Sequence, residues 1–295
     1  MQRKLHPLEG LVAAFALFIA LFLTIGFAQA DEIRKQKAEI KKQKAVFLRS
    51  SSALVLDAAT GEAVIDKNSE AVVPIASITK LMTAMVILDR GLDLQTRIVL
   101  SRDDTRAIRG SRTRLRSGAS LTRDELLMLS LMASENLAAA ALGRTYPGGM
   151  DAFVEAMNAK AAKLDMTDTH FVEPTGLSPE NVSSARDLAS LVRAANRYPL
   201  IREYSTRERG TVTVFKRPLS FGNTNRLVRS SQWDIELSKT GYISQAGRCL
   251  VMRVHLGSKD LIVVLLDSWG RQSRIGDANR IRKWLESTAG TGHSS

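Results

Sequence analysis

The order of residue patterns along the chain is the feature that most restricts how it can fold. Short apolar runs near residues 53–65 indicate strands, the middle of the chain is helical, and the last third returns to strands before a closing helix. Strands before and after a helical block favour an antiparallel sheet with helices packed on it. The pattern therefore predicts an α+β fold, an α/β sandwich in which an antiparallel sheet is flanked by helices, plus a helical subdomain.

The strands are predicted at the two ends of this domain. A first hairpin joins residues 53–56 to residues 63–65, with Gly61 placed to accept a positive φ angle. Later strands are expected at 211–215, 237–239, 249–256 and 261–267. Residues 257–260 have the composition of a turn, so the last two strands should form an antiparallel pair.

The helices are predicted from apolar periodicity and capping residues. Residues 77–88 follow Pro74, contain no Gly or Pro and are apolar almost all round, which predicts a buried helix. Thr122 and Glu125 form a capping-box signature ahead of a second apolar helix at 126–132, which should end near Ser134. Further helices are expected at 137–142, at 150–164, at 186–196 after Ser183 or Ser184, and at 275–285.

The N-terminal residues 1–30 have the pattern of a secretory signal peptide. Arg3 and Lys4 precede an apolar run over residues 11–28, and Ala28-Gln29-Ala30 is a small-x-small cleavage sequence. The run is longer than most cleaved signals, so an uncleaved membrane anchor is the alternative. Residues 31–48 form a basic linker, either a solvated spacer or an arm resting on anionic lipid or cell-wall polymer. One compact domain should follow at 49–289, with a flexible tail at 290–295.

The charge and the cysteine content of the sequence restrict which binding partners and which kinds of catalytic site are possible. The 42 Lys and Arg residues exceed the 30 Asp and Glu residues and give a formal charge of +12, which favours anionic partners. Export argues against nucleic acid and favours the cell envelope. Cys249 is the one cysteine of the sequence, which excludes an intramolecular disulfide and a multi-thiolate zinc site. We expect no metal and no organic cofactor. A Ser-His-Asp enzyme built on His170 or His255 is a minor alternative.

Three short motifs carry nucleophile chemistry. Ser77-Ile78-Thr79-Lys80 places a hydroxyl and an amine on one face of a predicted helix, as a nucleophile and its base require. Ser134-Glu135-Asn136 follows a predicted helix, where it could also be a simple helix stop, and Lys239-Thr240-Gly241 lies on a predicted strand. The first two patterns are each expected about once by chance, but the third only at roughly 0.06. All three in this order are expected in about one such chain in a hundred.

These motifs resemble the three signatures of the serine penicillin-binding and β-lactamase superfamily, over roughly residues 50–287. The runs LSLMASEN at 129–136 and FVEPTGL at 171–177 resemble the low-molecular-weight D-alanyl-D-alanine peptidases, and most of all the endopeptidases of the penicillin-binding protein 7 type. The resemblance implies a penicillin-binding protein/β-lactamase-like transpeptidase fold and a periplasmic serine endopeptidase. Its implied substrate is the D-alanyl-meso-diaminopimelate cross-link of peptidoglycan, and β-lactams are its implied covalent inhibitors.

The resemblance also implies a role for each site residue. In the catalytic step Ser77 is the nucleophile, Lys80 its base, and Ser134 the relay of a proton to the leaving amine. For the substrate, Asn136 orients Lys80 and holds an amide, Lys239 and Thr240 bind the carboxylate next to the scissile bond, Gly241 leaves room for the peptide, and the backbone N–H groups of Ser77 and Tyr242 hold the oxyanion. To act as a base, Lys80 needs a pKa about 3 pH units below its usual value near 10.4, through burial and the neighbouring Lys239 cation.

Alternative activities within this superfamily differ in other features. Carboxypeptidase relatives that trim pentapeptide stems usually continue into a β-rich second domain, whereas this sequence ends soon after Trp284. Glu173-Pro174 invites comparison with the deacylating glutamate of class A β-lactamases, but the run around it is closer to the peptidases, in which it is structural. Relatives often carry Thr or Ser where this chain has Ile243, so no side-chain hydrogen bond to substrate is expected there. A non-enzymatic envelope protein that retains the fold is the remaining alternative.

Overall fold

The structure is a computed structural model that describes residues 46–108 and 110–290. The chain divides into two compact units, Met1–Phe47 and Leu48–Ser295, and every element described below belongs to the second. The predicted signal peptide, most of the predicted linker and the last five residues lie outside the described residues. Within residues 46–108 and 110–290, no helix combines the length and the apolar character needed to span a bilayer.

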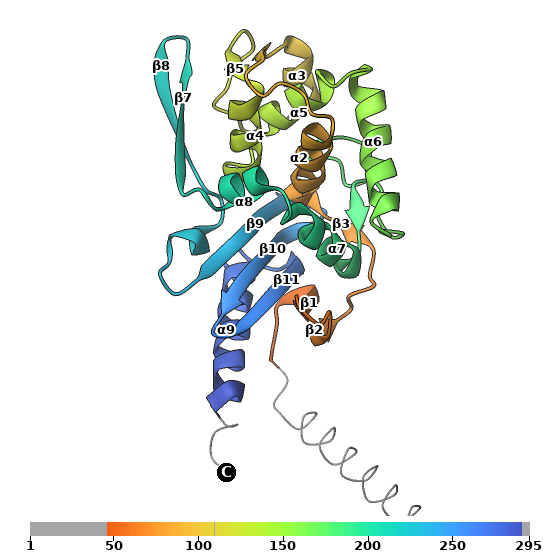
Figure 1. Ribbon diagram of the computed structural model, residues 1–295, viewed down its shortest axis with the longest axis vertical. Helices are drawn as coiled ribbons and strands as arrows, with labels where there is room; N and C mark the ends of the chain where they lie inside the picture. The colour runs from red at the N-terminus through yellow and green to blue at the C-terminus, as the bar shows by residue number, and fades with distance from the viewer. Residues whose placement is uncertain (1–45, 109, 291–295) are drawn as a thin grey trace, which may run out of the picture. The chain divides into compact units, whose positions relative to one another are not determined.

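A five-stranded antiparallel sheet is the base of the second unit (Figure 1). Its spatial order is β2-β1-β11-β10-β9, so β1, near the start of the unit, pairs with β11, near its end. The strands are β1 (Ser50–Asp57), β2 (Ala63–Lys67), β9 (Asp234–Ile243), β10 (Gly247–Leu256) and β11 (Lys259–Ser268). The predicted hairpins at both ends of the domain are therefore confirmed, including a positive φ of 74° at Gly61.

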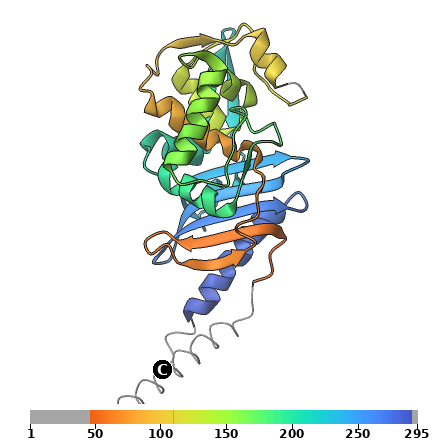
Figure 2. The same cartoon turned by 90° about the vertical axis from the view of Figure 1, so that its right-hand side faces the viewer.

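Helices cover both faces of this sheet. α7 (Ala185–Ala195) and α9 (Ser273–Gly290) both pack on β1, β10 and β11. Side chains alternate between the two faces of a strand. Along β11, Ile262 and Val264 join the main hydrophobic core with α7, whereas the equally buried Val263 lies outside that core, on the side of α9. The sheet is thus the middle layer of a sandwich, which confirms the predicted fold class (Figure 2).

A helical subdomain is built on the α7 side of the sheet (Figure 1). Its core is α2, which is buried along most of its length as the sequence predicts. The subdomain contains α2 (Lys80–Asp89), α3 (Arg102–Ala107), α4 (Arg123–Met132), α5 (Asn136–Arg144) and α6 (Gly149–Lys163). Thr122 caps α4 through the predicted capping box with Glu125, and Ser184 rather than Ser183 caps α7.

The structure contains several short elements that were not predicted from the sequence. Pro199, which lies just beyond the helix predicted at 186–196, is the first residue of the unpredicted helix α8 (Pro199–Thr206). The strand predicted at 211–215 is confirmed as β7, and β8, which was not predicted, pairs with it in a separate ribbon. The remaining elements are β3 (Val73–Pro74), β4 (Arg97–Val99), β5 (Ser120–Thr122), β6 (Val182–Ser183), β7 (Arg209–Val214), β8 (Arg217–Gly222) and the 3₁₀ turns η1 (Ala76–Thr79) and η2 (Arg226–Arg229). The start of the helix predicted at 77–88 is thus a 3₁₀ turn.

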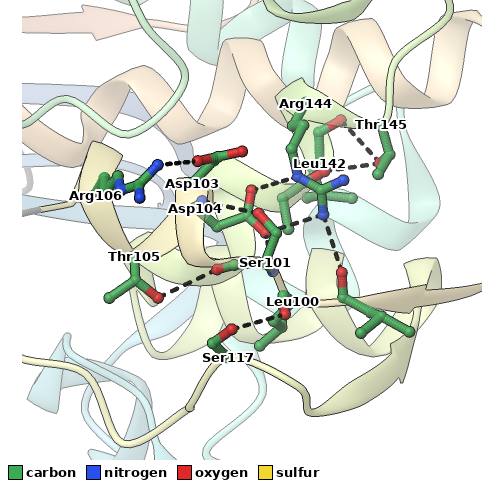
Figure 3. A network of polar contacts seen from close by, with 12 residues as sticks. Leu100, Ser101, Asp103, Asp104, Thr105, Arg106, Ser117, Leu142, Arg144 and Thr145 are labelled. Atoms are coloured by element: carbon green, nitrogen blue, oxygen red, sulfur yellow. Dashed lines mark hydrogen bonds and ion pairs between the residues drawn. The ribbon is translucent and has the colours of Figure 1, made fainter.

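An ion pair between a buried carboxylate and a half-buried arginine joins α3 to α5 at the edge of the helical subdomain (Figure 3). The side chain of Asp104 is 1% exposed and accepts hydrogen bonds from Arg144 Nε at 2.6 Å and Nη2 at 3.0 Å. Asp104 also accepts from the backbone N–H of Ser101, which caps α3 in return. Asp104 is therefore both the capping partner of one helix and the charge partner of another.

Candidate active site

Ser77 lies on the 3₁₀ turn η1, directly before the buried helix α2. Ala76 has a φ of 48°, in the left-handed region that a residue with a Cβ rarely adopts, so the chain turns sharply just before Ser77. Ser77 is partly exposed, whereas Lys80 is fully buried at the first turn of α2. The Nζ atom of Lys80 lies 2.9 Å from the Oγ atom of Ser77. The predicted hydroxyl and amine thus meet within hydrogen-bond distance.

The surroundings of Lys80 favour its neutral form. Its Nζ donates to Asn136 Oδ1 at 2.7 Å and to the carbonyl oxygen of Thr175. Burial lowers the pKa of Lys80 to about 7, although the negative charges of Glu173 and Glu135 oppose that change. The predicted fall in the pKa is therefore confirmed with burial as its cause, whereas the expected repulsion between the two lysines acts on Lys239, whose pKa the charge of Lys80 lowers. A lysine with this pKa is largely deprotonated at slightly alkaline pH and can accept a proton from Ser77.

Ser134 and Lys239 form a second hydroxyl–amine pair facing the first. Ser134 lies in the turn between α4 and α5 with a φ of 57°, and its Oγ accepts a hydrogen bond from Lys239 Nζ at 2.9 Å. Lys239 is 1% exposed on β9. Its pKa is well below the usual value because of burial first, and then because of the positive charges of Lys80 and Arg274. An anion bound here would favour the charged form of Lys239.

The two residues after Lys239 bring β9 up against the turn of Ser77. Thr240 Oγ1 donates to Thr224 Oγ1 at 2.6 Å. A Cβ atom on Gly241 would lie only 2.9 Å from the carbonyl oxygen of Ile75 and 3.1 Å from the backbone nitrogen of Ser77. Glycine is therefore required here by the packing of this chain itself, besides any room it leaves for a peptide. Tyr242 follows with its side chain 56% exposed.

The loop that follows α6 supplies a wall of the site that sequence reasoning treated only as a structural segment. The carboxylate of Glu173 accepts hydrogen bonds from the backbone N–H groups of Thr175 at 2.6 Å and Gly176 at 2.5 Å, and from Asn181 Nδ2 at 3.0 Å. This arrangement holds the Thr175 carbonyl on Lys80. A Cβ atom on Gly176 would lie 2.0 Å from the carbonyl oxygen of Ala76, so the loop packs directly on the nucleophile turn.

Two charged residues near the site were missed by the sequence reasoning. Arg274 of α9 donates to the carbonyl oxygens of Gly241 at 2.6 Å and Cys249 at 3.2 Å, and burial lowers its pKa to about 10. Glu135 is 7% exposed, and burial raises its pKa. Glu135 belongs to the second motif, so the sequence places it near the site. Neither its burial nor the hydrogen bonds of Arg274 can be predicted from motif spacing. No group of three or more metal-ligating side chains occurs in the part of the chain that the structure describes.

Comparison with known proteins places this arrangement among enzymes. A family model described as D-alanyl-D-alanine carboxypeptidase, a serine peptidase family, matches residues 37–270. A D-alanyl-D-alanine endopeptidase of Pseudomonas aeruginosa is 46% identical over 91% of this chain and 87% of its own length. One of Escherichia coli is 43% identical over 93% of this chain and 88% of its own length.

Solved structures of this kind have the same fold. The DD-transpeptidase of Streptomyces K15 superposes with a TM-score of 0.75 at 25% identity, covering 82% of this chain and 98% of that chain. A D-alanyl-D-alanine carboxypeptidase of Mycobacterium tuberculosis superposes with a TM-score of 0.74 at 26% identity, covering 83% and 93%.

Proposed function

Because the chain belongs to the D-alanyl-D-alanine carboxypeptidase family of serine peptidases, we propose that it cuts D-alanyl-meso-diaminopimelate cross-links of peptidoglycan. It would act as a D,D-endopeptidase through an acyl-enzyme on Ser77. The observation that carries this proposal is the 2.9 Å contact between Ser77 Oγ and Lys80 Nζ, at a lysine whose pKa is about 7. The high identity to two proteins named as endopeptidases favours this activity over others of the family.

Acylation begins with transfer of the hydroxyl proton of Ser77 to neutral Lys80. The oxygen of Ser77 forms a bond to the carbonyl carbon of the D-Ala residue, and the carbonyl oxygen takes the negative charge between the backbone N–H groups of Ser77 and Tyr242. When the tetrahedral intermediate breaks down, the C–N bond is cleaved and the leaving amine takes a proton from Ser134. Ser134 recovers one proton, the one that Lys80 took from Ser77, so Lys80 is neutral again, while Lys239 keeps its hydrogen bond to the Oγ of Ser134.

Substrate binding uses the cationic end of β9. Lys239 and Thr240 would bind the carboxylate next to the scissile bond, and Asn136 would hold a substrate amide while it orients Lys80. Water then hydrolyses the acyl-enzyme with Lys80 again as the base. A β-lactam would acylate Ser77 by the same route, which makes it a covalent inhibitor when hydrolysis is slow.

Glu173 argues against the β-lactamase alternative. A deacylating glutamate must hold a water molecule with its carboxylate, but here that carboxylate accepts hydrogen bonds from three backbone N–H groups and an asparagine amide of its own loop. These hydrogen bonds support a structural role for Glu173.

The cell envelope is the proposed place of action. Residues 1–30 would direct export to the periplasm, 31–48 would form the basic linker, 49–289 the catalytic domain and 290–295 the tail. The formal charge of +12 suits an anionic wall polymer, and the membrane would be a partner only if the signal stays uncleaved. The family description supports one second candidate activity, removal of the terminal D-Ala from pentapeptide stems.

The test is a parallel digestion of purified cross-linked dimers and free pentapeptides by the wild type and by Ser77→Ala. We expect the wild type to convert dimers to monomers, and Ser77→Ala to do neither reaction. If the wild type releases D-Ala from pentapeptides but never yields monomers from dimers, the endopeptidase proposal is wrong. Fluorescent penicillin followed by peptide mapping should place the adduct on Ser77.

A further inference from the structure

A pocket of about 280 Å³ lies beyond Tyr242, between the β9–β10 turn and the start of α9. Two exposed aromatic residues line it, Tyr242 at 56% and Trp269 at 75% exposure. Two arginines line it as well, the half-buried Arg248 and the exposed Arg271. Asp267 is the single carboxylate among its lining residues. The pocket therefore combines two guanidinium groups, one carboxylate and two exposed rings.

Arg248 is held in place by its neighbours. It stands opposite Tyr242 in the β9–β10 register, and its Cζ atom lies 4.3 Å from the centroid of the Tyr242 ring. Its positive charge also lowers the pKa of the nearby Arg274. A guanidinium stacked on a ring is a partly ordered donor, which is suited to a planar carboxylate. An anion that binds Arg248 would also relieve the repulsion between these two arginines.

The pocket lies beside Tyr242, one residue past Gly241 along β9, and its place relative to the substrate is argued from the proposed function. Along β9, Lys239 and Thr240 bind the carboxylate of the leaving side, and Gly241 stands beside the nitrogen of Ser77. The acyl side of the substrate must therefore extend past Gly241 toward Tyr242. An extended peptide rises by about 3.4 Å per residue, so the residue before D-Ala lies level with Tyr242.

We propose that this pocket, lined by Arg248, Arg271, Asp267 and Trp269, binds the amino-carboxylate end of the diaminopimelate side chain that precedes D-Ala in the donor stem. That side chain ends in one carboxylate and one ammonium group, joined to the backbone by a short methylene chain. The arginines take the carboxylate, Asp267 takes the ammonium group, and the indole of Trp269 covers the methylenes. The pocket is thus a specificity subsite for stems of the diaminopimelate type.

The test measures binding alone, on the Ser77→Ala protein, so it is independent of which bond the wild type cuts. Nuclear magnetic resonance titration would compare a pentapeptide stem that contains meso-diaminopimelate with one that contains lysine, which lacks the side-chain carboxylate. We expect the lysine stem to bind about tenfold more weakly. Adding Arg271→Gln or Arg248→Gln should weaken binding of the diaminopimelate stem about tenfold and leave the lysine stem within about twofold.

Arg217→Gln is the matched control, an exposed arginine on the distant β7–β8 ribbon, and it should change neither affinity. Equal binding of the two stems to the Ser77→Ala protein would overturn the subsite, as would an arginine variant that weakens both stems equally. Failure of the wild type to cut dimers would instead overturn the endopeptidase proposal and leave this binding result standing.

Discussion

Lys80 shows how burial at one position can lower the pKa of a lysine enough for it to act as a base. The lysine is fully buried, and its burial outweighs the two carboxylates, Glu173 and Glu135, that favour its charged form. The remaining polar contacts of Nζ are a hydroxyl, an amide oxygen and a backbone carbonyl, none of which carries a charge. These neutral acceptors take hydrogen bonds from the amine but do not stabilise its charged form as strongly as a carboxylate would.

The first prediction concerns the pH dependence of acylation. Lys80 is the base only when deprotonated, so the rate of penicillin acylation should rise with pH and level off above its pKa of about 7. Stopped-flow acylation with fluorescent penicillin from pH 5 to 10 measures this profile. Lys80→Arg should lower the rate at least about 100-fold, because a guanidinium stays protonated. A rate that still climbs at pH 9 to 10 would contradict the role of Lys80.

Lys239 leads to the second prediction. Lys239→Ala should slow acylation by about 30-fold, because it removes the cation that contacts Ser134 and would bind the substrate carboxylate. Repulsion between the two buried ammonium groups is mutual, so its loss should also raise the pKa of Lys80 and move the pH profile to higher pH. Lys163→Ala, at an exposed lysine of α6, is the control. An unshifted profile would show that Lys239 does not act on Lys80.

The residues that could be read from the sequence are those in short motifs. Ser77 contacts Lys80, and Ser134 contacts Lys239, as the motifs suggest, because each motif occupies a defined element end or strand. The roles of Arg274 and of the Thr175 carbonyl depend on contacts with residues at least 25 positions away. No local pattern reports such contacts, which is why they were missed.

At the scale of elements, the hydrogen bonds within the loop at 173–178 stabilise the fold and also hold the Thr175 carbonyl oxygen against Lys80. The third prediction is that Glu173→Gln lowers the free energy of unfolding by about 1–3 kcal/mol, because an amide oxygen cannot replace both carboxylate oxygens toward the Thr175 and Gly176 N–H groups. Thermal unfolding measures this loss. The half-life of the penicillin adduct in this variant should stay within about twofold of the wild-type value. If Glu173 were the deacylating residue, its replacement would lengthen that half-life far more.

The pairing of α3 with α5 gives the fourth prediction. Arg144→Met should cost about 3–5 kcal/mol of stability, because it leaves the carboxylate of Asp104 buried without its charge partner. Arg106→Met is the matched control, since Arg106 pairs with Asp103 at more than 70% exposure on both sides and should cost less than about 1 kcal/mol. Chemical denaturation of both variants measures the difference, and equal losses would contradict the argument.

The predictability of the elements follows the same local logic. The capping box at Thr122 and the turn around Gly257 were read correctly because those residues act on their own neighbours. β8 was missed because it contains Arg217 and Pro218 and packs little apolar surface. Its turn is formed by Phe215 and Lys216, both with positive φ, where glycine or asparagine is the usual signal.

At the scale of the molecule, the start of β1 is tied to the last helix. The backbone N–H groups of Arg49 and Ser50 donate to the carboxylate of Asp277 in α9, at 2.9 and 2.7 Å. The fifth prediction compares a protein that begins at Val46 with one that begins at Ala53, by thermal unfolding and by penicillin labelling. A protein beginning at Ala53 should lose stability and labelling, since it lacks these contacts. Equal stability of both truncations would contradict this account.

The pairing of β1 with β11 has a consequence for the life of the chain before it is finished. Ser77 and Lys80 are synthesised long before the last strands, but the sheet cannot close until residues 261–268 are available to β1. We expect Lys80 to stay hydrated and protonated until then, so a nascent polypeptide should carry a serine with no base. Such a chain should not react with penicillin, and reactivity with penicillin would become a reporter of completed folding.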